Sequence, residues 1–96
     1  MRLGIITTTY ISRTGDEVAQ KQEPNLVASY DVALEEFEAR VEHFSSLAEK
    51  KGRKYKQLPF EDRLVISWTD GDTDWQQIIE LMTVSTINRQ IKINIE

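Results

Sequence analysis

The sequence contains no cysteine, and this single absence excludes a group of chemistries. Disulfides, thiolate nucleophiles, zinc–thiolate centres and iron–sulfur clusters all need thiol side chains, and the 96 residues supply none. His43 is the only histidine, so a metal centre lacks a second nitrogen ligand. The four glycines are isolated, so no glycine-rich loop is present to bind a phosphate. We therefore expect no cofactor, no metal and no enzymatic activity.

Long apolar runs are also missing. None approaches the roughly 20 residues that a membrane-spanning helix needs, and the N-terminus becomes polar at Thr7, too early for a signal-peptide core. The composition, 40% hydrophobic and 29% charged, is ordinary for a globular domain. We expect one domain over residues 1–96, a cytosolic location and no membrane partner.

One long helix is predicted between Ser29 and Gly52. Apolar side chains recur there at spacings of three and four, which places them along one stripe; they are Leu34, Phe37, Val41, Phe44 and Ala48. Ser29 or Asp31 can cap the start of the helix, and Gly52 can end it in the left-handed conformation.

Several segments have the composition of β-strands. Residues 3–11 alternate and are rich in β-branched side chains, residues 63–69 place Leu64, Ile66 and Trp68 on one face, and residues 53–58 form a weaker candidate. The last strand is predicted over residues 90–96. Residues 17–23 are predicted to be either a solvated edge strand or a loop.

The segment after residue 70 has two interpretations. Trp75, Ile78, Ile79 and Met82 follow the i, i+3, i+4, i+7 spacing of a helix, and Thr73 with Gln76 fits a capping box. The rival is a hairpin through Asp70-Gly71, which would place Ile66 opposite Trp75. Because Ile78 and Ile79 are adjacent, strict strand alternation fails, and the pattern favours a short helix.

These elements predict an α+β fold. One antiparallel sheet would carry one long and one short helix on one face, in a ferredoxin-like (split βαβ) order, with ββαβαβ as the variant.

The net charge of −4 is unevenly distributed. A basic run, which we define as Lys50, Lys51, Arg53, Lys54, Tyr55 and Lys56, contains five of the twelve Lys and Arg residues. Its charges can neutralise phosphates and its tyrosine can stack on a base, so it predicts a nucleic-acid-binding module as the alternative function. The acidic charge of the remaining chain opposes this alternative.

A second candidate surface combines acids with tryptophans. It consists of Trp68, Asp70, Asp72, Asp74 and Trp75. An EF-hand is excluded there, because its glycine and glutamate positions are occupied by Trp75 and Leu81. An exposed tryptophan beside carboxylates is instead typical of a protein-binding anchor. A self-association edge is predicted at Ile91, Ile93 and Ile95, which would give a homodimer.

From these features we expect a small non-enzymatic interaction protein, such as an adaptor, an inhibitor or a regulatory subunit, which acts by binding another protein. Compact cytosolic proteins without motifs are often encoded by phages or mobile elements, and we expect the same origin for this protein.

Overall fold

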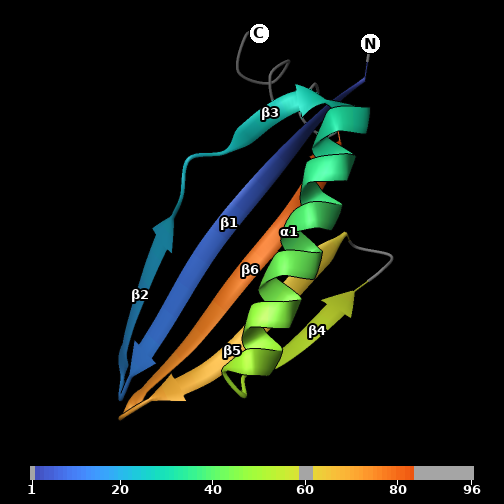
Figure 1. The fold of residues 1–96 in the computed structure, drawn as a ribbon. Helices are drawn as coiled ribbons and strands as arrows, with labels where there is room; N and C mark the ends of the chain where they lie inside the picture. Colours follow the sequence, from blue (N-terminus) through green and yellow to red (C-terminus); the bar gives the residue numbers. More distant parts are fainter. Residues whose placement is uncertain (1, 59–61, 84–96) are drawn as a thin grey trace, which may run out of the picture.

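The computed structural model describes residues 2–58 and 62–83, which form one helix packed on one antiparallel sheet (Figure 1). The strands and the helix follow in the order β1 (Leu3–Thr14), β2 (Glu17–Gln22), β3 (Leu26–Ser29), α1 (Tyr30–Lys50), β4 (Lys54–Leu58), β5 (Arg63–Asp70) and β6 (Thr73–Thr83). Within the described residues, no helix is both long enough and apolar enough to span a membrane.

The sheet has the order β2-β1-β6-β5-β4, and β3 also pairs with β1. The longest strands, β1 and β6, are therefore central. β2 and β3 pair with opposite halves of β1, so together they form one edge, and β4 forms the other. Helix α1 leaves the β3 edge and crosses one face of the sheet to reach β4 (Figure 1).

Two tight turns organise the strands, and both use a Gly-Asp pair. β1 and β2 are joined by Gly15-Asp16, and β5 and β6 by Gly71-Asp72. Gly15 and Gly71 have φ angles of +60° and +63°. The first loop position of a two-residue hairpin needs such a positive φ, which residues with an L side chain rarely adopt. Since Thr14 pairs with Thr73, the tips of the two hairpins lie side by side.

Residues 17–23 were predicted to be either a solvated edge strand or a loop. The structure shows the edge strand, over Glu17–Gln22. The edge is interrupted after Gln22, where Pro24 cannot donate a ladder hydrogen bond. Across the interruption the pairing with β1 shifts by one residue, from Thr9 opposite Gln22 to Ile6 opposite Leu26.

The core lies between α1 and the sheet. From the helix, Ala33, Phe37 and Ala48 are buried; from the sheet, the buried apolar residues are Ile6, Leu64, Ile66, Ile79 and Leu81. The predicted stripe is confirmed in outline, because its other members, Leu34, Val41 and Phe44, are half-buried against this core. Sequence analysis missed Ala33, whose small side chain allows the helix to approach Gly4 closely.

The predicted second helix is wrong, and with it the ferredoxin-like order and the ββαβαβ variant. Residues 73–83 form the central strand β6, so the capping box at Thr73 is not formed. Ile79 and Leu81 face the helix, whereas Ile78 lies on the opposite face, opposite Val65. A central strand with apolar side chains on both faces lacks the strict apolar–polar alternation of a half-buried strand. Its apolar residues can therefore match the helical spacing by coincidence.

The alternative prediction, a hairpin after residue 70, is correct, but its register is wrong. Its loop is Gly71-Asp72, which places Trp68, not Ile66, opposite Trp75. The strands predicted at residues 3–11, 53–58 and 63–69 are present as β1, β4 and β5. The predicted final strand, with Ile91, Ile93 and Ile95, lies outside the described residues.

Candidate interaction site

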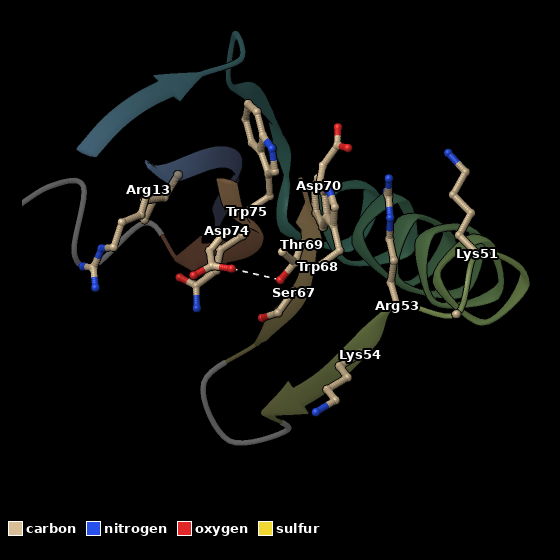
Figure 2. A pocket seen from close by; sticks show the side chains of 13 residues that line it. Arg13, Lys51, Arg53, Lys54, Ser67, Trp68, Thr69, Asp70, Asp74 and Trp75 are labelled. Atoms are coloured by element: carbon tan, nitrogen blue, oxygen red, sulfur yellow. Dashed lines mark hydrogen bonds between the residues drawn. The ribbon is translucent and has the colours of Figure 1, made fainter. Parts of the chain in front are cut away.

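An open groove of about 840 Å³ lies at the end of the sheet where β5 turns into β6. We call it the tryptophan groove. Its charged and aromatic lining residues are Arg13, Lys51, Arg53, Lys54, Trp68, Asp70, Asp74 and Trp75. They come from β1, β4, β5, β6 and the segment that joins α1 to β4, so residues distant in sequence meet at this end (Figure 2).

Two tryptophans form the aromatic part of the groove. Trp68 and Trp75 are directly opposite each other in the β5–β6 hairpin, so their side chains share the helix-facing side of the sheet. Their ring centroids are 6.1 Å apart and the ring planes differ by 7°. Both side chains are half-buried, and Trp68 also packs against the core. Its position is therefore fixed by packing from below.

Arg53 extends this stack. Its guanidinium carbon lies 4.0 Å from the centre of the Trp68 ring, a geometry for a cation–π interaction. In Figure 2, Trp68 stands between Trp75 and Arg53. The three side chains thus form one ordered layer, in which Trp68 is the central member.

The end of α1 determines where Arg53 lies. Gly52 adopts a φ of +68°, its N–H donates to the Glu49 carbonyl at 3.2 Å, and the Arg53 N–H donates to the Ala48 carbonyl at 2.8 Å. This pair of bonds is the Schellman motif, which satisfies the last helical carbonyls and reverses the chain. The predicted role of Gly52 as the helix terminator is confirmed.

Polar side chains line the opposite face of the same strands. Ser67 pairs with Gln76, and Thr69 pairs with Asp74, so these residues alternate with the tryptophans. The Thr69 hydroxyl donates a hydrogen bond of 2.9 Å to the Asp74 carboxylate. Figure 2 shows Ser67 and Lys54 pointing away from the indole rings. The groove therefore wraps around the end of the sheet and has an aromatic side and a polar side.

The charges of the groove differ from those of the chain. Arg13, Lys51, Arg53 and Lys54 contribute four positive charges, and Asp70 and Asp74 contribute two negative ones. A chain with a net charge of −4 therefore has a local excess of positive charge at this end. Such an excess favours acidic groups on whatever binds there.

The structure joins the two surfaces that the sequence presented as alternatives. Of the predicted protein anchors, Trp68, Asp70, Asp74 and Trp75 line the groove, while Asp72 lies in the exposed turn. Of the basic run, only Lys51, Arg53 and Lys54 reach it. The connection between the helix end and the β5–β6 turn depends on tertiary contacts, so no spacing in the sequence indicated it.

The remainder of the basic run is dispersed. Lys50 ends the helix, and Lys56 lies on the face of β4 opposite to Tyr55. The Tyr55 hydroxyl donates a hydrogen bond to the Glu49 carboxylate, which raises the pKa of the phenol above its usual 10.0. Tyr55 therefore contacts the helix, away from the stacked layer that Trp68 and Arg53 form.

Sequence analysis missed Arg13 as a groove residue. β1 carries it next to the Gly15-Asp16 turn, and it pairs with Asp74 across β1 and β6. The usable signal was the repeated Gly-Asp pair at residues 15–16 and 71–72, because two such turns predict two hairpins whose tips can be adjacent.

The groove offers no evident metal-binding chemistry. Within residues 2–58 and 62–83, no three His, Cys, Asp or Glu side chains are grouped to hold a metal ion. Asp70 pairs with Thr73 on the helix-facing side of the sheet, and Asp74 lies on the other side, so these carboxylates diverge.

Comparison with known proteins gives no relative: no family model matches the sequence, and neither the curated proteins nor the solved structures contain a significant match.

Proposed function

We propose that this protein is a small non-enzymatic interaction protein that binds another protein through the tryptophan groove. The observation that carries the proposal is the layer of Trp75, Trp68 and Arg53, which remains half-buried at the end of the sheet. Tryptophan and arginine are the residues most enriched among those that dominate the binding energy of protein interfaces.

The rigidity of the layer supports the same proposal. Trp68 and Trp75 belong to the central hairpin, and Arg53 follows a hydrogen-bonded helix end. Side chains that are already ordered lose less conformational entropy when a partner binds, so more of the contact energy appears as affinity.

The surrounding charges form a suitable rim. Arg13, Lys51 and Lys54 are exposed, as are Asp70 and Asp74. Protein interfaces typically have an apolar centre and a polar rim, and mixed charges at the rim orient the partner. An adaptor, an inhibitor or a regulatory subunit would each use such a surface. A cytosolic location belongs to this proposal, since a chain without cysteine needs no oxidising compartment to fold.

A single-stranded nucleic acid is the second candidate ligand. The observation in its favour is that Arg13, Lys51, Arg53 and Lys54 line the same groove as the two tryptophans, a combination that single-strand-binding proteins use. The layer argues against it, because Trp68 is covered by its neighbours and base stacking needs free rings. Asp70 and Asp74 also offset two of the four positive charges that phosphates would meet there. We therefore favour a protein partner.

Affinity capture with matched variants tests the proposal. Immobilised wild-type protein, Trp75→Ala and a control, Val32→Ala, would be exposed to host-cell extract with and without nuclease. Val32 is 55% exposed on the helix and outside the groove, so its variant removes apolar surface elsewhere. We expect partners that wild type and Val32→Ala retain with nuclease present and that Trp75→Ala loses.

Two results would contradict the proposal. One is a partner set that Trp75→Ala retains in full while its circular dichroism spectrum matches wild type. The other is capture that disappears with nuclease and weakens steeply with salt. The second result, together with loss of nucleic-acid binding in a Lys51→Glu, Arg53→Glu, Lys54→Glu triple variant, would establish the nucleic-acid alternative.

A further inference from the structure

Within the part of the chain that the structure describes, the β2 edge of the sheet is open and long enough to accept another strand. All six of its residues, Glu17–Gln22, are exposed. Among the described strands β2 pairs only with β1, and it lies away from α1 (Figure 1). No proline, glycine or bulge interrupts Glu17–Gln22. Of the features that usually protect an edge strand from pairing with another chain, β2 therefore has only its charged side chains.

The hairpin determines which backbone groups of β2 face outward. In a two-residue hairpin the flanking residues, here Thr14 and Glu17, exchange both hydrogen bonds, and bonded pairs then alternate along the ladder. The Glu23 N–H donates to the Thr8 carbonyl at 3.0 Å, which continues the same alternation. The N–H and C=O groups of Val18, Gln20 and Gln22 therefore point away from β1.

These outward groups allow antiparallel pairing with a second copy. If the two-fold axis passes at Ala19, Val18 of each copy is opposite Gln20 of the other, and these two residues carry the outward bonding groups. The same register places Glu17 of each copy opposite Lys21 of the other, on the helix-facing side of both sheets. Side chains of unlike charge that face each other directly across two strands stabilise the pairing.

The neighbouring registers lack this charge match. Centring the axis on Val18 places Glu17 opposite Ala19 and leaves Lys21 opposite Gly15. Centring it on Gln20 places Glu17 opposite Glu23, which pairs like charges. The Ala19-centred register is thus the one of these three in which both charged residues of β2 find partners of opposite sign.

The other edge is unsuited to the same contact. β4 carries Lys54 and Lys56 on one face, so antiparallel self-pairing would bring lysines together. Pairing through β2 alone is isologous and closes after two copies.

We propose that β2 is a homodimerisation edge, at which two copies join their sheets through the Ala19-centred register. This proposal goes beyond the proposed function and does not depend on it, because Glu17 and Lys21 do not line the tryptophan groove. The earlier expectation of a homodimer through Ile91, Ile93 and Ile95 concerned a different segment. The contact is short, so the dimer is expected to be weak and dependent on concentration.

Sedimentation equilibrium of the full chain, over a concentration series that reaches the millimolar range, tests the proposal. Lys21→Glu and Glu17→Lys each create two like-charge pairs across the axis, so each should weaken the dimer about tenfold. The combined variant Glu17→Lys, Lys21→Glu restores unlike pairs and should return the dissociation constant to near that of wild type. Lys56→Glu, a charge change on the opposite edge and outside the tryptophan groove, is the matched control and should leave the dimer unchanged.

A backbone variant tests the strand pairing itself. Gln20→Pro removes an N–H that points away from β1, so the hairpin keeps its own hydrogen bonds and the dimer should be lost. Circular dichroism confirms that each variant folds. The proposal is overturned if wild type stays monomeric over the whole series or if assembly continues beyond the dimer. It is also overturned if Glu17→Lys, Lys21→Glu does not restore the dimer affinity that each single variant loses.

Discussion

Gly4→Ala should destabilise the protein, although alanine usually stabilises a strand relative to glycine. A Cβ atom added at Gly4 would lie 2.8 Å from the Cβ of Ala33 and 3.3 Å from a methyl carbon of Leu81. Non-bonded carbons prefer about 3.5–4.0 Å, so α1 would have to move away from β1 by about 1 Å. Ala33 is fully buried and its Cβ is fixed to the helix backbone, so no side-chain rotation relieves the contact.

The magnitude follows from two opposing terms. Overpacking a close-packed core costs about 1–3 kcal/mol, and the lower conformational entropy of the unfolded alanine chain returns about 0.4–1 kcal/mol. We expect a net loss of about 1–2 kcal/mol in the free energy of unfolding. For a domain of this size such a loss lowers Tm by roughly 5–15 °C.

Urea denaturation followed by tryptophan fluorescence measures this loss, and an unchanged m-value would show that the folded state is retained. The double variant Gly4→Ala, Ala33→Gly removes the close contact. Its destabilisation should therefore be at least about 0.5 kcal/mol smaller than the sum of the two single changes. If Gly4→Ala is as stable as wild type, or if the two changes are simply additive, the close approach of α1 to β1 is not as described.

Two further predictions concern the core and a titrating side chain. Leu64 is fully buried between α1 and the sheet, so Leu64→Ala should cost about 2–5 kcal/mol, whereas Val27→Ala, at a side chain that is 57% exposed, should change stability by less than about 0.5 kcal/mol in the same urea titration. The hydrogen bond to Glu49 raises the pKa of Tyr55 above 10.0, so the folded state holds this proton at a pH where the unfolded chain has released it. The stability from this bond is full below about pH 10 and decreases as the pH rises through the folded-state pKa. Urea midpoints measured between about pH 9 and 11 should therefore fall less for Tyr55→Phe than for wild type, and identical slopes would contradict the assignment.

The helix α1 shows how much a sequence pattern can determine. Its apolar stripe and its termination at Gly52 were predictable, because helix periodicity and the φ preference of glycine act over a few neighbouring residues. Ser29, one of the two predicted caps, occupies the N-cap position, but its side chain makes no capping hydrogen bond. The strand β6 shows the opposite case. Its neighbours on both sides, β1 and β5, make it central, and only that placement explains why apolar side chains occur on both of its faces.

The candidate site divides in the same way. Composition identified the tryptophans, the acids and the basic run as candidate binding residues, and local turn chemistry allowed a hairpin at Gly71. The register that stacks Trp68 on Trp75 depended on which two residues form the loop, and a shift of two positions would have placed Ile66 there instead.

By itself the sequence therefore determined the helix, the strands β1, β4 and β5 and the exclusion of thiol chemistry, since these depend on short-range sterics and on composition. Only the tertiary structure decided that Arg13, Arg53 and the two tryptophans share one groove, and that β2 forms an edge of the sheet among the described strands. Both facts result from pairing between segments distant in the chain, which the hydrophobic core selects and which no local pattern records.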